Sequence, residues 1–388
     1  MTYKRKATDL VQKAAAIARS EGKLSGFTIG NTAKIDKDGL YFTPLRRTSL
    51  MVTAGVIVYS ERQAIDIARI ADGQVQYILV DAEKKVSQEM SRSGEPGNVE
   101  RAVRETVKKS KLWIYKGNDL AVEAVDILIT QLTKNELQGI GGKKVTILGA
   151  GNLGCKLALR LVERGAHVFI TRRDRRKLSV ITRALNIIKP IHTTARIHGT
   201  TNNEEAAKGA NILVGVSQGL PLITDKIIQQ LAPRAIVIDA GKGTLYKEAL
   251  RTAQTLEIAV YRLDISAPFE GLIHQLWAIE QIVDYRMGRR RVVGEAIVSG
   301  GLLGRKGEVI VDNIQDPKII YGISNGQGDF IRRLTERHQQ SIRKIQKFIE
   351  DSALESKVND ITSDAISGQR GITARESIVI ANYEEEAC

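Results

Sequence analysis

Three glycines at a characteristic spacing give the clearest chemical signal in the sequence. Gly149, Gly151 and Gly154 follow an apolar segment at 144–148 and open a segment with helical periodicity. In such a strand–turn–helix unit the first glycine permits a tight turn, the second lets the backbone approach a pyrophosphate, and the third allows close helix packing. The spacing predicts a dinucleotide site; the alternative is a glycine-rich turn that binds no cofactor. The loop residues expected at the dinucleotide are the three glycines with Ala150, Asn152 and Leu153.

Basic residues follow this loop where such sites often carry an acid. About 20 residues after the first glycine, NAD sites offer Asp or Glu to the ribose, whereas NADP sites place arginine against the 2′-phosphate. The sequence there is "TRRDRRK", residues 171–177. Thr171 can donate a hydrogen bond, Arg172 can stack on adenine, and Arg173 or Lys177 can hold the phosphate. The segment predicts NADP as cofactor; the alternative is a surface charge run at a helix start.

Two series of alternating strand and helix patterns must position these residues. The first runs from about residue 48 to 138, and the second follows the glycine-rich boundary "GIGGKK" at 139–144. We therefore expect an α/β protein with two α/β domains, the second a Rossmann-type doubly wound parallel sheet, and a C-terminal helical extension. The predicted parts are a substrate domain at 1–138, an NADP-binding Rossmann domain at 139–268, a helix returning to the first domain at 269–300, a strand plus long amphipathic helix at 301–356, and a disordered tail at 357–388.

The last part of the chain shows helical periodicity. The segment 271–291 is predicted to be a helix that includes the basic run 286–291. Farther on, apolar residues at spacings of three and four predict one face of a long helix within 326–356, namely Ile331, Leu334, His338, Ile342, Ile345 and Ile349. Its charged face predicts a solvated helix, and nucleic-acid binding is the less favoured alternative.

Composition limits the classes of function. The chain has 388 residues with 43% hydrophobic and 26% charged, which is typical of a globular protein, and its longest apolar runs are too short to cross a membrane. The formal net charge of +14 favours anionic ligands. Cys155 and Cys388 lie too far apart in sequence for a disulfide framework or a thiolate metal cluster. We expect a cytoplasmic protein with no metal site.

Two stretches near the second domain resemble a known family. Residues 211–264 and the segment "GLIHQLWAIEQ" at 271–281 resemble the last strands and following helix of the shikimate dehydrogenase-like family. Residues 211–264 are also similar to methylene-tetrahydrofolate and methylene-tetrahydromethanopterin dehydrogenases. The resemblance implies that the loop "SQGLP", residues 217–221, passes near the nicotinamide through Ser217 and Gly219. It also implies that Gln275 faces the substrate.

A third stretch, "YKGNDLAVEAVDIL" at 115–128, is similar to the segment of the shikimate family that links the two domains. The resemblance implies a catalytic role for Asp119, with Asn118 beside the substrate. From the residues themselves, Lys116 lies three positions before Asp119, and a lysine–carboxylate pair suits the proton transfer that accompanies hydride transfer. Lys84 and Lys85 follow another predicted strand and are alternatives for the lysine, while helix capping is the alternative for Asp119.

These features together predict an NADP-dependent oxidoreductase that acts on a small anionic metabolite, with homodimer formation left open. One alternative is a methylene-tetrahydrofolate or methylene-tetrahydromethanopterin dehydrogenase-like one-carbon enzyme. Another, of a different class, is a sensor or scaffold that binds NADP(H) without catalysis. Glutamyl-tRNA reductase is not favoured because no cysteine precedes Gly149. Neither a nucleic acid nor a membrane is expected as a partner.

Overall fold

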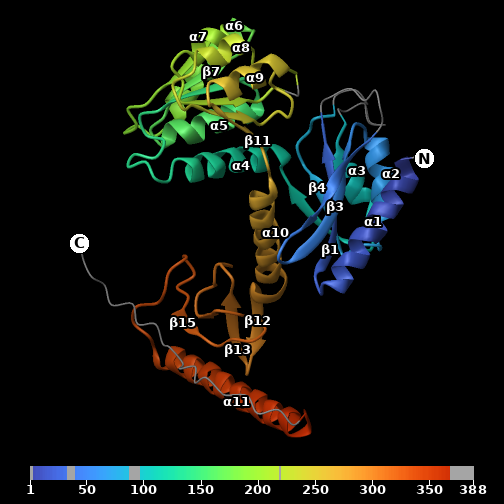
Figure 1. The fold of residues 1–388 in the computed structure, drawn as a ribbon. Helices are drawn as coiled ribbons and strands as arrows, with labels where there is room; N and C mark the ends of the chain where they lie inside the picture. Colours follow the sequence, from blue (N-terminus) through green and yellow to red (C-terminus); the bar gives the residue numbers. More distant parts are fainter. Residues whose placement is uncertain (1–2, 33–39, 87–96, 218–219, 368–388) are drawn as a thin grey trace. The chain divides into compact units, whose positions relative to one another are not determined.

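The computed structural model describes residues 3–32, 40–86, 97–217 and 220–367, with side chains up to Leu354 (Figure 1). The chain forms two compact units, Met1–Ile273 and His274–Cys388. The first unit contains a five-stranded and a six-stranded sheet, and the second contains a four-stranded sheet. The prediction of an α/β fold with two α/β sheets and a C-terminal extension is confirmed.

The five-stranded sheet of the first unit has the order β2-β3-β1-β4-β5. Its strands are β1 (Leu24–Asn31), β2 (Tyr41–Arg47), β3 (Met51–Val58), β4 (Tyr77–Asp81) and β5 (Lys111–Tyr115). All pairings are parallel except that of β2 with β3. Strand β1, "LSGFTIGN", lies at the centre with seven of its eight residues buried. The sequence pattern did not indicate it, because its glycines and polar residues interrupt any apolar run.

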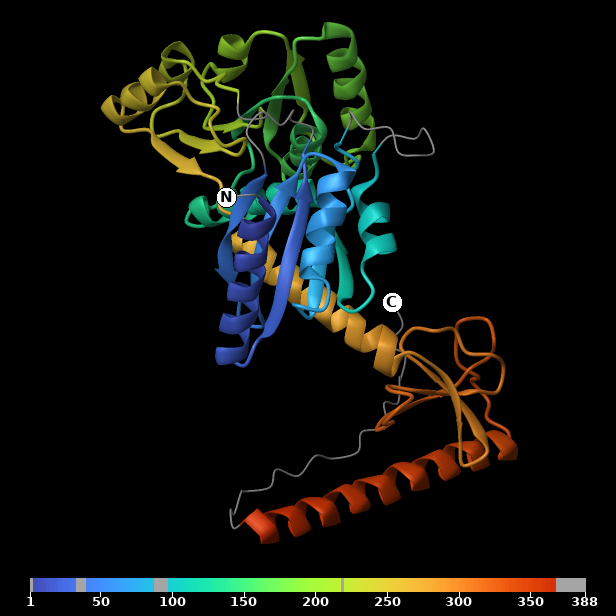
Figure 2. The same cartoon turned by 90° about the vertical axis from the view of Figure 1, so that its right-hand side faces the viewer.

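Helices α1 (Tyr3–Ser20), α2 (Glu61–Ala71) and α3 (Val99–Thr106) pack on this sheet (Figure 2). Small residues let α1 and α2 approach the strands closely, so that Ala14 and Ala68 are buried in one cluster with Phe27, Ile29 and Val56. The Ser60 side chain caps α2 by accepting a hydrogen bond from the Gln63 N–H at 3.2 Å. This packing fixes the direction of the strands and the edge where their carboxyl ends meet.

The six-stranded sheet is parallel throughout, with the order β11-β10-β9-β6-β7-β8. Its strands are β6 (Lys144–Leu148), β7 (His167–Thr171), β8 (Ile197–Thr200), β9 (Ile212–Gly215), β10 (Ile236–Asp239) and β11 (Ala259–Arg262). The order reverses between β6 and β9, which is the switch point of a doubly wound sheet. The predicted Rossmann-type topology is therefore confirmed. Strand β8 was not predicted, because the short polar sequence around it shows neither alternation nor an apolar run.

Six helices accompany this sheet: α4 (Gly117–Leu132), α5 (Asn152–Glu163), α6 (Arg175–Ile188), α7 (Asn203–Ala207), α8 (Asp225–Gln229) and α9 (Lys247–Thr255). Helix α4 follows the first sheet in the chain, yet its Val125 and Ile129 are buried together with Leu157 and Leu161 of α5 (Figure 1). The start of α4 therefore lies where the first sheet ends, and its body packs on the core of the second sheet.

Helix α10 (Ser266–Gln281) follows the second sheet, and its first turns contact the first sheet. The Ser49 N–H donates a hydrogen bond to Glu270 Oε1 at 2.8 Å, and Phe269 and Ile273 are buried. Across the part of the chain that the structure describes, no helix combines the length and the apolar character needed to cross a membrane.

The second unit pairs β12 (Gly288–Val292), β13 (Glu295–Ser299), β14 (Val309–Val311) and β15 (Ile320–Ile323) in chain order. The predicted helix over 271–291 is wrong at its C-terminal end. Helix α10 ends at Gln281, a π-helical turn covers Ile282–Arg286, and the basic run 289–291 lies on β12. Val293 and Gly294, with φ of 44° and 85°, form the two-residue turn to β13. Two positive φ values are the pattern of a type I′ hairpin turn, which the sequence "VG" does not signal.

Helix α11 (Glu336–Ser367) packs on this small sheet through Ile345 and Ile349 (Figure 2). The predicted helical face is corrected at its start, because Ile331 and Leu334 precede the helix and the Ile331 N–H instead donates to Ile323 O at 2.8 Å. The helix also continues through residues 357–367, where disorder was expected. The rest of the predicted tail, 368–388, lies outside the described residues.

Candidate cofactor and substrate sites

The glycine loop joins β6 to α5 and has the geometry that its spacing predicts. Gly149 has a φ of 128°, which favours glycine, and a Cβ on Gly154 would lie 1.9 Å from the Gly149 carbonyl oxygen. Gly151 is the N-cap of α5, and a Cβ there would meet no atom within 4 Å. Two of the glycines are thus required by the turn and the packing. The third leaves open space at a helix N-terminus, where backbone N–H groups can bind phosphate oxygens.

The basic segment after β7 is fastened to this loop. The Ala150 N–H donates to the carbonyl oxygen of Thr171, a buried residue, at 2.8 Å, and Arg172 Nη1 donates to the Ala150 carbonyl oxygen at 2.8 Å. Arg172 Nε is buried and has no hydrogen-bond partner among the described residues. A buried donor without a partner costs free energy, so this guanidinium is placed to donate to a bound group.

The next residues are exposed at the start of α6. Asp174 caps α6 by accepting a hydrogen bond from the Lys177 N–H at 3.0 Å, and Lys177 Nζ lies 3.9 Å from Asp174 Oδ2. Arg173 makes no ion pair with any described residue. The acid of "RRDRR" is therefore used as a helix cap, and Arg173 keeps its charge available for a ligand.

Two loops lie side by side at the carboxyl ends of β9 and β10. The Ser217 hydroxyl donates to the Leu220 carbonyl oxygen at 2.5 Å, and a Cβ on Gly241 would lie 1.9 Å from the Ser217 carbonyl oxygen. Asp239, buried at the end of β10, accepts hydrogen bonds from the Thr244 hydroxyl at 2.8 Å and the Gly243 N–H at 2.8 Å. Gly219, the other residue expected at the nicotinamide, lies outside the described residues.

The carboxyl edge of the first sheet carries a charged cluster around Asp81, the last residue of β4. The buried Asp81 carboxylate accepts hydrogen bonds from the Gly117 N–H at 3.2 Å and from Lys85 Nζ at 2.8 Å. Lys85 Nζ also lies 2.7 Å from Glu83 Oε2. Two carboxylates thus hold the Lys85 ammonium beside the start of α4, while Lys84 is exposed.

Asn118 connects this cluster to the glycine loop. Its backbone N–H donates to Glu83 Oε2 at 2.8 Å, and its Nδ2 donates to Asn152 Oδ1 at 3.1 Å. The structure therefore brings the predicted substrate residue Asn118 against the predicted cofactor residue Asn152. Leu153, next in the loop, is half-buried against the core of the second sheet.

The predicted pair of Asp119 and Lys116 is present but loose. Lys116 Nζ lies 3.9 Å from Asp119 Oδ2, and both side chains are about half exposed or more. Asp119 makes a shorter contact with Lys156 of α5, whose Nζ also lies 3.6 Å from Glu83 Oε1. The catalytic role of Lys116 and Asp119 stays a prediction. Gln275 is exposed on α10 and belongs to the second unit, so its role at the substrate also stays a prediction.

Sequence reasoning missed several residues at the edge of the first sheet. Tyr115 pairs with Asp81 in the strand register, and burial, with the nearby Asp81 charge, raises the pKa of its phenol above the usual range. Asn31 Nδ2 donates to the Asp81 carbonyl oxygen at 2.9 Å, and Asn31 Oδ1 is buried without a partner among the described residues. The available signal was positional, because Asn31, Asp81 and Tyr115 each end a parallel strand.

Comparison with known proteins bears on the second sheet. Residues 144–266 match the family model described as NAD-dependent glycerol-3-phosphate dehydrogenase N-terminus. No curated protein matches the chain.

Several solved structures are similar. L-tryptophan dehydrogenase from Nostoc punctiforme is 18% identical, with 66% of this chain and 74% of that chain covered and a TM-score of 0.38. Dipicolinate synthase from Bacillus halodurans is 13% identical, with 57% and 72% covered and a TM-score of 0.32. NADPH-dependent glyoxylate/hydroxypyruvate reductase from Sinorhizobium meliloti is 16% identical, with 42% and 81% covered and a TM-score of 0.27.

The family match covers all strands of the six-stranded parallel sheet, and it includes the glycine loop and the basic segment. The strand order, the open space at Gly151 and this match agree with one another. Residues 144–266 form a Rossmann domain of the NAD(P)-binding superfamily.

Proposed function

We propose that the chain is an NADP-dependent oxidoreductase that acts on a small anionic metabolite. The observation that carries the proposal is the basic pair after β7: Arg172 has a buried Nε without a partner among the described residues, and Arg173 is exposed without an ion pair there. An NAD site would place a carboxylate at this point, but the acid present, Asp174, caps α6. The residues present therefore fit a 2′-phosphate better than a ribose hydroxyl.

The open loop at Gly151 would hold the pyrophosphate at the N-terminus of α5, and Thr171, Arg172, Arg173 and Lys177 would surround the adenosine end. Bound NADP(H) supplies or accepts a hydride at the nicotinamide. Ser217 and Gly219, in the loop after β9, are the residues of this chain proposed to contact the nicotinamide.

Lys85 is the residue that the geometry favours for proton transfer. In the reductive direction the substrate carbon gains a hydride, and the Lys85 ammonium donates a proton to the carbonyl oxygen, which leaves an alcohol and a neutral amine. The oxidative direction reverses both transfers. Asp81 and Glu83 position the ammonium, and the buried Asn31 oxygen and the protonated Tyr115 hydroxyl offer an acceptor and a donor nearby. Lys116 with Asp119 is the alternative pair.

Three narrower functions are compatible with this site. The shikimate dehydrogenase-like resemblance of residues 211–281 supports a hydroxy acid or oxo acid substrate, and the one-carbon dehydrogenase resemblance supports a pterin carrier. A sensor or scaffold that binds NADP(H) without catalysis is the alternative of another class. The half-buried lysine between two carboxylates favours catalysis, because holding a cation at the edge beside the cofactor loop has no use in nucleotide binding alone.

The test compares two arginine variants. Arg173→Ala is expected to raise the Kd for NADPH at least tenfold and to leave the Kd for NADH unchanged, because only NADPH carries the 2′-phosphate. Arg176→Ala, an exposed arginine within the first turn of α6, is the matched control and should change neither Kd. Equal weakening of NADPH and NADH by Arg173→Ala would refute the phosphate assignment.

A further inference from the structure

The loop after β10 contains a lysine in an unusual backbone conformation. Lys242 has a φ of 56°, a value that side chains with a Cβ rarely adopt, and it lies between Gly241 and Gly243. Hydrogen bonds from Gly243 and Thr244 to Asp239 hold this conformation, and Gly241 packs on the Ser217 carbonyl oxygen. Glycine would fit position 242 without strain. A strained residue that its surroundings hold in place points to a use for its side chain.

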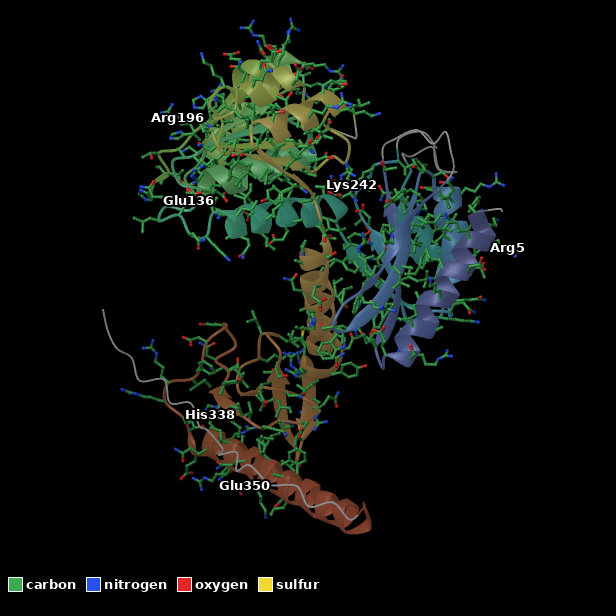
Figure 3. All side chains as sticks on the ribbon, viewed as in Figure 1. Arg5, Glu136, Arg196, Lys242, His338 and Glu350 are labelled. Carbon is green, nitrogen blue, oxygen red and sulfur yellow. The ribbon has the colours of Figure 1, made fainter. Side chains whose placement is uncertain are left out.

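The Lys242 side chain is exposed and has no ion pair or hydrogen bond with any described residue. Figure 3 labels Lys242 on one side of the Rossmann domain and Arg196, which directly precedes β8, on the opposite side. Lys242 follows the carboxyl end of β10, and ligands of open α/β sheets bind at the carboxyl ends of the strands. The lysine therefore stands on the ligand-binding edge.

A second cation without an ion pair among the described residues comes from the first sheet. Arg46, on β2, is half-buried, and its guanidinium carbon lies 5.8 Å from the centre of the Phe269 ring at the start of α10. This distance is within the range of a cation–π contact, which orients the guanidinium without neutralising it. Its neighbour Arg47 differs, because it pairs with Glu21 at 2.9 Å.

One carboxylate lies near both cations. Asp264, between β11 and α10, accepts hydrogen bonds from the Ser266 hydroxyl at 2.7 Å and the Ser266 N–H at 2.9 Å. These bonds lower the pKa of the Asp264 carboxyl, and the charges of Arg46 and Lys242 lower it further. Arg46 and Lys242 thus lie in one neighbourhood, where a single carboxylate, already engaged by Ser266, faces two cations.

We propose that Arg46 and Lys242 bind an anionic oxygen group of the substrate, a carboxylate or a phosphate. The planar guanidinium can donate two parallel hydrogen bonds to such a group, and the lysine adds a point charge from the opposite sheet. This inference rests on the proposed function, because it assigns the recognition of the anionic substrate to residues outside the cofactor site.

The experiment is a calorimetric titration of the full chain, saturated with NADPH, with oxalate and separately with inorganic phosphate. We expect one of the two anions to bind, with oxalate identifying a carboxylate site and phosphate a phosphate site. Arg46→Gln and Lys242→Gln should each raise the Kd of that anion at least tenfold without changing the Kd for NADPH. The controls Arg47→Gln and Lys247→Gln, which replace nearby basic residues of the same types, should leave both constants unchanged.

Lys242→Gly separates recognition from folding. Glycine relieves the strain at φ 56°, so this variant should unfold at no lower temperature than the natural chain while losing the anion. Binding of neither anion, equal losses in the two control variants, or a loss of NADPH affinity in Lys242→Gln would each overturn the proposal. If the natural chain does not bind NADPH, the proposed function fails, and the same titrations of the nucleotide-free chain still decide the role of Arg46 and Lys242.

Discussion

Gly151 and Gly154 lie three positions apart, but different constraints require them. A Cβ on Gly154 would collide with the Gly149 carbonyl oxygen, whereas a Cβ on Gly151 would enter open space. The first constraint belongs to the fold and the second only to a ligand. The two residues therefore allow stability and cofactor affinity to be separated.

Gly154→Ala is expected to lower the free energy of unfolding by about 1–3 kcal/mol, the cost of forcing a methyl group into packed backbone. Gly151→Ala is expected to leave the free energy of unfolding unchanged and to weaken NADPH binding at least tenfold, because the methyl group would occupy the space of the pyrophosphate. Urea unfolding and calorimetric titration of both variants make the comparison. Equal stability of the two variants would contradict these roles of the glycines.

At the same scale, the sequence revealed the cofactor residues better than the substrate residues. The glycine spacing is local, so Gly149, Gly151 and Gly154 could be read directly from the chain. The cluster of Asn31, Asp81, Lys85 and Tyr115 is assembled by strand pairing, because each residue comes from a different strand end or the loop after it. Pairing between distant segments leaves no mark in a single sequence.

At the scale of elements, the packing of α1 on α2 depends on one carboxylate. The Tyr3 hydroxyl donates to Asp66 Oδ2 at 2.7 Å, and Lys4 Nζ lies 2.8 Å from the same oxygen. These bonds, first that of Lys4 and then that of Tyr3, hold the pKa of Asp66 below its usual value of 3.8. A depressed folded-state pKa contributes stability above the unfolded-state value, and this contribution disappears as the pH falls through the folded-state value.

Asp66→Asn should therefore destabilise the chain at about pH 6 more than at about pH 3, where the natural carboxyl is also protonated in part. Urea unfolding of both proteins at the two pH values measures the difference. Asp9→Asn, an exposed acid on α1, is the control and should show no such dependence. The same destabilisation by Asp66→Asn at both pH values would contradict the assigned role.

The β12–β13 hairpin is the element that the sequence concealed most fully. Arginines fill the strand that precedes the turn, so no apolar alternation appears, and Val293 occupies a position where asparagine or glycine is usual. Val293→Asn creates an Asn-Gly turn and should stabilise the hairpin by about 1 kcal/mol, because it relieves a β-branched residue of the left-handed conformation.

Hydrogen exchange of residues 288–299 is the measurement, and protection should rise in Val293→Asn. Val293→Ala, which keeps a Cβ at the strained position without the local hydrogen bonding of asparagine, is the control and should change protection less. Lower protection in Val293→Asn than in the natural chain would show that the turn is not of this type.

At the scale of the whole molecule, the chain joins a Rossmann domain to a second α/β sheet and carries a separate unit of four strands and a long helix. Alternation of strand and helix predicted the two large sheets, because parallel strands and their crossover helices leave a strong periodic signal. It did not predict the small sheet, whose strands are short and largely polar. The net charge of +14 is consistent with an anionic cofactor and substrate, which are the ligands proposed here.

The central claim is that the basic segment after β7 selects NADPH. Calorimetric titration of the natural chain with NADPH and with NADH, at low and at high salt, tests it most directly. We predict at least tenfold tighter binding of NADPH at low salt and a smaller preference at high salt, because the 2′-phosphate is held by charge. Equal affinity for the two nucleotides, or binding of neither, would contradict the claim.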